Sequence, residues 1–340
     1  MDNAACHSDW DNVFQYVADP IDLDALPDKH AASRSEFANF SGMPTPPLSH
    51  DGSPIHDDPP ETSNLVSVST TFYPGSLHQS LMPDAILLSE DSVFFYIHSH
   101  ILLAASDNGF HSLLSPPPPP SKDQDRIINV PETSAVINII LHTIYDMSCS
   151  HYSPSFSQLS TAVKRLPFYG IQPQSYIMTS TPLFTLLHSH APLCPLELYT
   201  LAASFDLYEL AVSTSSHLLS FPLSSMSDEM SDAIGPVYLK RLFFLHFGRA
   251  DALKRVLLPP PHPHPPTEEC DFSDQKKLTR AWALASAYLA WDARPDLSTS
   301  AMESALRPLE EHLVCNECKQ TLRERIKDLV VQWSLVKRTI

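Results

Sequence analysis

FYIHSHILLAAS, residues 95–106, joins a strand-like pattern to a helix-like one. The residues just before His98 form a continuous apolar run, which is typical of a buried strand. After His98, the apolar side chains of Ile101, Leu102 and Ala105 recur at the spacing of one helical face. The polar residues that follow Ala105 break this pattern. The stretch therefore predicts a strand that passes directly into a short helix.

The sequence on both sides of this stretch predicts further strands and helices. Apolar residues alternate with polar ones over residues 66–72, which is the period of a half-buried strand. Residues 85–88 form a short apolar run, and the polar residues 90–92 supply the turn that makes them a hairpin with residues 93–97. Downstream, the pattern predicts a short helix over residues 110–114, a strand over 127–130 and a helix over 134–145.

The order of these elements and the residues within them resemble the BTB (POZ) family. Residues 95–106 are similar to the family segment F-x-x-H-[KR]-x-[VI]-L-x-A-x-S. The signature residues are Asp84, Phe95, His98, Leu102, Ala104 and Ser106. The downstream residues that resemble the family's next strand and helix are Val130, Ser134, Val136, Ile144 and Tyr145. The whole chain also resembles a group of fungal BTB-containing proteins of unassigned function.

The resemblance implies an α+β fold, a small mixed sheet flanked by helices, that serves as a protein-interaction module. Such a module would associate with itself through its first strand and helix and would recruit protein partners. Two outputs are implied, an adaptor for a cullin-type ubiquitin ligase or a transcription-linked regulator. Ser99 departs from the family, because many members carry a Lys or Arg there that pairs with the upstream Asp. The hydrophobic-x-Glu motif used for cullin contact is not found in the expected segment either.

The composition divides the chain into five segments. Residues 1–62 are acidic and rich in Pro and Ser, with a net charge of −10, so we expect a disordered tail. The segments that follow are the BTB-like domain at residues 63–150, a helical extension at 151–258, a Pro/His-rich linker at 259–270 and a C-terminal helical region at 271–340. The last two-thirds of the ordered chain are expected to be all-helical, because apolar residues recur there at spacings of three and four.

Proline and capping signals predict where the later helices begin and end. Proline favours the first helical turn, and Ser favours the position just before it. Pro195 and Pro236 each predict the start of a helix, and Gly248 predicts a break in the second of these. Ser273 is the predicted cap of a helix over 277–291, and Ser300 with Glu303 forms a capping-box pattern. An apolar face over residues 322–336 predicts the last helix.

Composition and charge argue against several classes of function. The chain has a net charge of −17 and no basic stripe, so direct binding of nucleic acid is not expected. It has 7 Gly and 32 Pro, and it lacks the G-x-G-x-x-G and G-x-x-x-x-G-K loops that cradle nucleotide phosphates. It also lacks the catalytic motifs G-x-S-x-G and H-E-x-x-H. We therefore do not expect an enzyme.

The sequence indicates an intracellular protein, in the nucleus or the cytoplasm. Six cysteines are few for 340 residues, which favours a reducing compartment, and the first residues lack a secretory signal pattern. The longest run without charges, residues 166–196, contains five prolines. We do not expect that run to cross a membrane.

Cys315-x-x-Cys318 is the sharpest candidate for a metal site, because two thiolates at this spacing can bind one tetrahedral zinc ion. Cys270 and His264 would complete the site if the Pro/His-rich segment folds back onto them. The competing interpretation is that the cysteines pack as small apolar side chains. A structural zinc ion is thus the one cofactor that the sequence indicates.

Three His-x-His pairs offer a second pattern of ligands. They are His98/His100, His188/His190 and His262/His264. None has an acidic or cysteine partner within its own element, so a catalytic metal is not expected at any of them. A zinc-dependent enzyme that uses the His and Cys sets remains the rival from a different class. The other rival is a structural protein whose helical half forms a scaffold.

Overall fold

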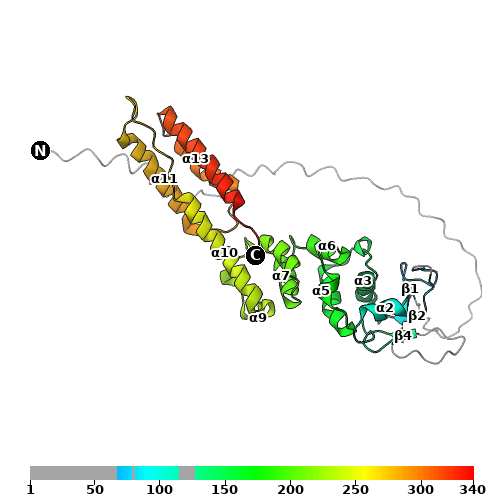
Figure 1. Ribbon diagram of the computed structural model, residues 1–340. Coiled ribbons are helices and arrows are strands. Elements are labelled where there is room, and N and C mark those ends of the chain that lie inside the picture. The colour runs from blue at the N-terminus through cyan, green and yellow to red at the C-terminus, as the bar shows by residue number, and fades with distance from the viewer. Residues whose placement is uncertain (1–66, 79–80, 115–126) are drawn as a thin grey trace, which may run out of the picture. The chain divides into compact units, whose positions relative to one another are not determined.

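The computed structural model describes residues 67–78, 81–114 and 127–340. The predicted acidic tail, residues 1–62, and the proline run at 116–120 lie outside this part of the chain. Within it, the fold is mixed α+β, with one small sheet followed by a long succession of helices (Figure 1). The predicted fold class is confirmed at this level.

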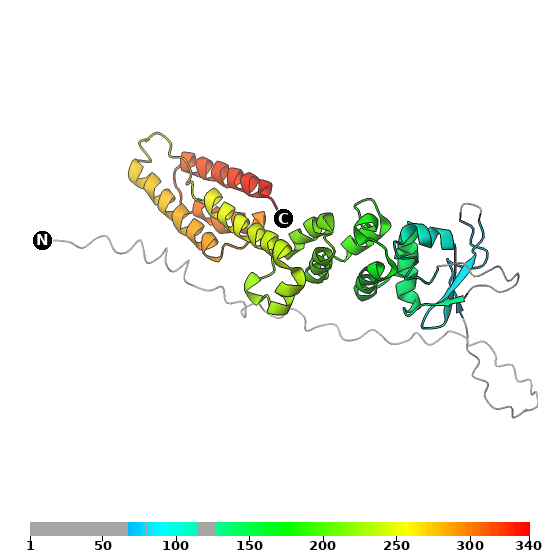
Figure 2. The ribbon, with the colours of Figure 1, turned by 60° about the horizontal axis from the view of Figure 1, so that its bottom comes forward.

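The sheet of the described chain has four strands in the order β1-β3-β2-β4, the blue to teal arrows of Figure 2. Strands β2 (Ala85–Leu88) and β3 (Val93–Ile97) form the predicted antiparallel hairpin. Strand β1 (Ser67–Val68) pairs with β3 in parallel, and β4 (Ile127–Asn129) pairs with β2 in parallel. Strand β1 thus lies beside β3, although β2 follows it in the chain, and β4 lies beside β2, although β3 precedes it. Both connections therefore pass over a neighbouring strand of the hairpin.

The hairpin turn also fixes the start of the long helix of the sheet domain. The carboxylate of Asp91 accepts hydrogen bonds from the backbone N–H of Ser134 at 2.7 Å and from its hydroxyl at 2.6 Å. Ser134 is the first residue of α3 (Ser134–Ile144), whose own cap residue makes no side-chain bond. Asp91 thus satisfies an N–H that the helix itself leaves unpaired. Nearly every residue of α3 after its first turn is buried.

Two predicted elements of the sheet domain are wrong in detail. The first strand is much shorter than residues 66–72, because the hydroxyl of Ser69 accepts the Phe72 N–H and turns the chain. Residues 110–114 form no right-handed helix, because Phe110 and its two successors have φ between 54° and 61°. This left-handed turn places the Phe110 ring 4.2 Å from that of Tyr169, stacked upon it. The predicted helix after β3 is confirmed as α2 (Ser99–Ala105).

Residues 150–235 consist of short helices, the green segments of Figure 2. The α-helices are α4 (Phe156–Arg165), α5 (Pro173–Tyr176), α6 (Pro182–Ser189), α7 (Pro195–Ser204), α8 (Tyr208–Ser215) and α9 (Asp228–Ile234). The 3-10 helices are Ser150–Tyr152, Leu166–Tyr169, Ser216–Leu218, Leu223–Ser225 and, later in the chain, Arg307–Glu310. Proline opens α7 as predicted, and it also opens α5 and α6.

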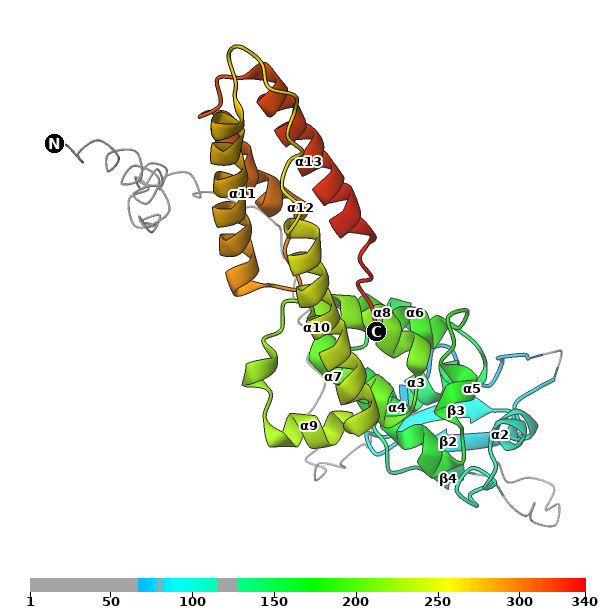
Figure 3. The same cartoon turned by 60° about the vertical axis from the view of Figure 1, so that its left-hand side comes forward.

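The last helices are longer and pack side by side, as Figure 3 shows. They are α10 (Pro236–Leu257), α11 (Phe272–Asp292), α12 (Thr299–Leu306) and α13 (Asn316–Leu335). Gly248 does not divide α10, which runs through it without a break. The predicted caps are two residues off: Asp271 caps α11 in place of Ser273, and Ser298 caps α12 in place of Ser300.

Two apolar cores hold the described chain together. The first extends from Phe72 to Leu242, so it continues across residue 150, where the sequence suggests a boundary. The second extends from Leu253 to Trp333 and includes two cysteines, Cys270 and Cys318. Helix α10 contributes side chains to both cores. None of the helices in the described part of the chain combines the length and hydropathy needed to cross a bilayer.

Candidate metal centre

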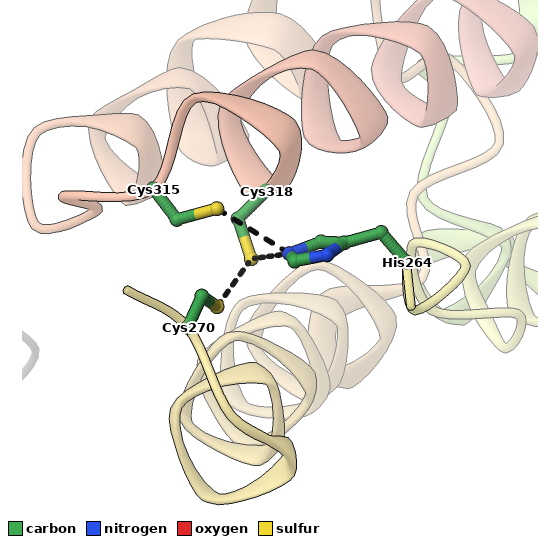
Figure 4. A group of neighbouring side chains, drawn as sticks. All are labelled: His264, Cys270, Cys315 and Cys318. Atoms are coloured by element: carbon green, nitrogen blue, oxygen red, sulfur yellow. Dashed lines mark hydrogen bonds between the residues drawn. The ribbon is translucent and has the colours of Figure 1, made fainter. Parts of the chain in front are cut away.

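The Pro/His-rich segment folds back onto the start of α13, which is the condition for a complete four-ligand site. Two side chains from this segment, His264 and Cys270, meet two from the helix start, Cys315 and Cys318. Figure 4 shows the four side chains pointing toward one another. Their ligand atoms all lie within 4.8 Å of one another, and this group could hold a metal ion.

The distances within this cluster are short. The Nε2 atom of His264 lies 3.3 Å from the sulfur of Cys315 and 3.3 Å from that of Cys318. The sulfur atoms of Cys270 and Cys318 are 3.7 Å apart. A zinc ion with Zn–S bonds of about 2.3 Å and a Zn–N bond of about 2.0 Å would place sulfur atoms about 3.8 Å apart and sulfur about 3.5 Å from nitrogen. These three separations are close to the values for a tetrahedral zinc site.

The histidine is oriented so that its Nε2 is the free ligand. Its Nδ1 lies 2.7 Å from the carbonyl oxygen of Pro265, which can only accept a hydrogen bond. Nδ1 therefore carries the proton and donates it, and Nε2 keeps its lone pair for the cluster. A second hydrogen bond of this kind typically fixes the ring of a metal-binding histidine. Pro265 directly follows His264, but nothing in the sequence marks its carbonyl as the partner of the ring.

Local backbone structure positions the three cysteines. Cys270 closes a tight turn with Thr267, whose N–H donates to the Cys270 carbonyl at 3.0 Å and whose carbonyl accepts the Cys270 N–H at 3.3 Å. Cys315 is the cap residue of α13 in extended conformation, and Cys318 lies in the first helical turn. The two cysteines are three residues apart at the start of this helix, and both sulfur atoms lie next to Nε2 of His264.

The pKa values of the three cysteine thiols are shifted in different directions. The Cys318 N–H at the helix start lowers the pKa of the Cys315 thiol below its usual value. Burial raises the pKa of Cys318 to about 12, and it also raises the pKa of Cys270. Three converging thiolates would repel one another in this buried site, and a divalent cation removes that penalty.

The His-x-His pairs do not form comparable sites. Among the described residues, the four-residue cluster is the group of His, Cys, Asp and Glu side chains close enough to hold a metal. His264 belongs to it without His262, and His312 is not a member. His98 and His100 have ring centres 6.0 Å apart, but both ring nitrogens of His98 are already engaged, with Tyr145 and Leu81. The expectation that no catalytic metal binds at these pairs stays a prediction.

His98, the centre of the signature stretch, is buried and fully hydrogen-bonded. Its Nε2 lies 3.0 Å from the carbonyl oxygen of Leu81, so Nε2–H donates and Nδ1 accepts. The Tyr145 hydroxyl lies 3.0 Å from Nδ1 and accepts the His98 backbone N–H at 2.9 Å. Burial raises the pKa of Tyr145 to about 12, so the hydroxyl stays protonated. This arrangement is that of a structural histidine.

The other signature residues have local structural partners. Asp84 accepts hydrogen bonds from the N–H and hydroxyl of Ser99, so it pairs with a serine where many BTB proteins have a cation. Phe95 and Leu102 are buried in the first core, whereas Ala104 is exposed. The hydroxyl of Ser106 donates to the carbonyl of Tyr169 at 2.6 Å and accepts the N–H of Phe110.

No protein-family model matches this chain, and no curated protein is significantly similar to it. The resemblance to the BTB family therefore stays a prediction.

Proposed function

We propose that this chain is a protein-interaction scaffold with a BTB-type domain, and that a structural zinc ion joins its last helices to the Pro/His-rich segment. The observation that carries the zinc assignment is the convergence of four side chains, His264, Cys270, Cys315 and Cys318, whose ligand atoms all lie within 4.8 Å of one another. Structural zinc sites have four protein ligands of this kind. When bound, the ion would supply cross-linking and charge neutralisation.

The rival interpretation, a zinc-dependent enzyme, fits this cluster less well. A catalytic zinc ion keeps one coordination position open for water or substrate. Here three sulfurs and one nitrogen already account for all four positions, and three of the four side chains are buried. The geometry supports a role in stability.

The interaction role is supported by the order of the elements and by exposed apolar side chains around them. A strand, a hairpin, a helix, a strand and a helix follow one another. The BTB resemblance implies this order with a second short helix before the last strand, where the chain forms the left-handed turn at Phe110. Val68 on β1 and Leu103 on α2 are exposed, as is Met82 just before β2. A surface of this kind is suited to association with a second polypeptide. The proposed partners are either components of a cullin-type ubiquitin ligase or transcriptional regulators.

Metal analysis of the purified full chain tests the zinc assignment. We expect one zinc ion per chain, retained during dialysis against a weak chelator. Cys318→Ser should lose most of the zinc and unfold at a temperature several degrees lower, because a buried ligand is removed. Cys194→Ser is the matched control, since Cys194 lies outside the cluster, and it should keep both the zinc and the stability. Full zinc content in the Cys318→Ser variant would contradict the assignment.

Affinity purification from native cells tests the interaction role. Deletion of residues 63–150 would expose the first core, which continues beyond them, so surface substitutions are the cleaner tool. Met82→Glu combined with Leu103→Glu should remove partners that bind the sheet domain. Leu335→Glu, at an exposed apolar position on α13, should leave those partners bound. Identical partner sets for the two variants would count against this surface.

A further inference from the structure

The three cysteines of the metal cluster differ in how far solvent reaches them. Cys270 and Cys318 are buried, with 2% and 3% of their surfaces exposed, whereas Cys315 is only partly buried. Cys315 directly follows Val314, which is 91% exposed, at the point where the chain enters α13. Because the oxidation of a cysteine depends on its exposure, a dissolved oxidant reaches Cys315 before the other two.

The start of α13 places Cys318 where it can form a disulfide with Cys315. Cys315 is the cap residue, in extended conformation, and Cys318 is the third residue of the helix. Residues three apart in a helix have Cα atoms about 5 Å apart, and disulfides span Cα separations of about 4.4–6.8 Å. Both sulfur atoms lie 3.3 Å from the same Nε2 of His264 (Figure 4). This pair can therefore close within one helix start, without movement of the Pro/His-rich segment.

Cys270 is the alternative partner, and the choice of partner decides what oxidation does to the fold. The sulfur of Cys270 lies 3.7 Å from that of Cys318. A disulfide between Cys270 and Cys318 would keep the Pro/His-rich segment tied to α13. A disulfide between Cys315 and Cys318 would instead lie within α13 and its cap, and it would leave the segment without a link through the metal.

We propose that the metal centre is a redox switch, in which hydrogen peroxide converts Cys315 and Cys318 to a disulfide and the zinc ion is released. This inference rests on the proposed zinc site. It adds a regulation of that site by an oxidant, and it assigns the three cysteines different roles. Cys315 is the thiol that is oxidised first, Cys318 closes the disulfide, and Cys270 serves as a ligand alone.

The oxidation proceeds in two steps. The sulfur of Cys315 attacks one oxygen of the peroxide, so that an S–O bond forms, the O–O bond breaks, and the departing hydroxide takes up a proton to become water. The sulfur of Cys318 then attacks the resulting sulfenic acid, so that the S–S bond forms and a second hydroxide leaves and is protonated. Two thiolates are thereby oxidised, and one hydrogen peroxide is reduced to two waters.

The disulfide leaves too few ligands for a structural zinc ion. His264 and Cys270 fill two of the four positions that such an ion requires. The metal link between the Pro/His-rich segment and α13 is therefore lost. A dithiol reductant reverses the reaction, because it exchanges with the disulfide and restores both thiols.

Peptide mapping of the zinc-loaded full chain after treatment with hydrogen peroxide tests the pairing. Trypsin does not cleave before proline, so Cys315 and Cys318 lie in one peptide, residues 281–319, and Cys270 lies in another, residues 256–276. Peptide 281–319 should become lighter by two hydrogen atoms in step with the release of zinc, which a zinc-sensitive dye measures. Peptides 256–276 and 281–319 joined by a disulfide, or zinc released without any disulfide, would overturn the proposal.

Two histidine variants separate the roles of the cysteines. Cys315→His keeps a zinc-binding side chain but removes the first thiol, so it should release zinc under peroxide about tenfold more slowly. Cys270→His is the matched control, because it keeps both cysteines of the proposed disulfide, and it should release zinc as fast as the unaltered chain. Equal resistance of the two variants would contradict the assigned roles. The peptide map of the unaltered chain decides the pairing independently of how well either variant folds.

The same experiment distinguishes failure of the switch from failure of the zinc assignment. A reduced chain that carries no zinc would refute the metal site itself. A chain that carries zinc and keeps it under peroxide would refute the switch and leave the structural site intact.

Discussion

Tyr145 and His98 show how one pair of residues fixes the junction between strand and helix. The Tyr145 hydroxyl is bonded both to the imidazole and to the backbone N–H of His98, and Leu81 holds the other side of the ring. The chain changes from β3 to α2 at this residue, so its buried N–H has no partner within either element. The tyrosine therefore replaces a backbone partner that the change of structure removes.

Tyr145→Phe is expected to lower the free energy of unfolding by about 1–3 kcal/mol, because it leaves a buried N–H and a ring nitrogen unsatisfied. Denaturant unfolding measures this change. Tyr73→Phe, at an exposed position, is the control and should shift the value by less than about 0.5 kcal/mol. Equal effects of the two substitutions would show that this hydroxyl does not hold the junction.

The residues of the metal cluster were predictable from the sequence because cysteine spacing and ligand chemistry are local signals. The Cys-x-x-Cys pair at the start of a helix implies two converging sulfurs, and histidine and cysteine supply zinc ligands. Their supporting groups were not predictable in the same way. The carbonyl of Pro265 carries no distinctive sequence pattern, because every residue has such a group and only the local backbone geometry turns this one toward the ring of His264.

At the scale of elements, Arg325 joins three segments of the second core. Its Nε donates to the carbonyl of Pro259 at 2.8 Å, and another nitrogen donates to the carbonyl of Val256 at the end of α10. The guanidinium also lies 5.3 Å from the ring centre of Trp282 on α11. These carbonyls lie at the end of a helix, where no further turn satisfies them.

Arg325→Lys is expected to lower the free energy of unfolding by about 1–3 kcal/mol, because a lysine cannot reach both carbonyls and stack on the ring together. Arg323→Lys, two residues earlier, is the matched control. Its side chain is exposed and pairs with Glu310, so the change should stay below about 1 kcal/mol. A larger loss for Arg323 than for Arg325 would contradict this account.

The elements were predicted well where apolar periodicity is long and poorly where several local signals compete. The hairpin follows from two apolar runs joined by a polar turn, and α3 and α13 follow from apolar periodicity. The caps of α11 and α12 were misplaced by two residues because Asp and Ser recur nearby, and geometry decides which side chain meets the free N–H groups. The left-handed turn at Phe110 has no sequence pattern, because the stacking of Phe110 on Tyr169 involves residues far apart in the chain.

At the scale of the whole molecule, the metal cluster belongs to one of two cores. Cys270 and Cys318 are part of the second core, whereas α3 and α4 belong to the first. Removal of the metal should therefore speed amide hydrogen exchange in α11 and α13 and leave α3 and α4 protected. Mass spectrometry with and without a strong chelator measures this difference. An equal change in both cores, or no change in either, would contradict a local role for the metal.

X-ray absorption at the zinc edge, on the purified full chain, tests the central claim most directly. A shell of three sulfur atoms at about 2.3 Å and one nitrogen atom at about 2.0 Å is the predicted result. The same shell should be lost in the Cys318→Ser variant. A shell that contains a water oxygen, or one without sulfur, would contradict a structural site built from His264, Cys270, Cys315 and Cys318.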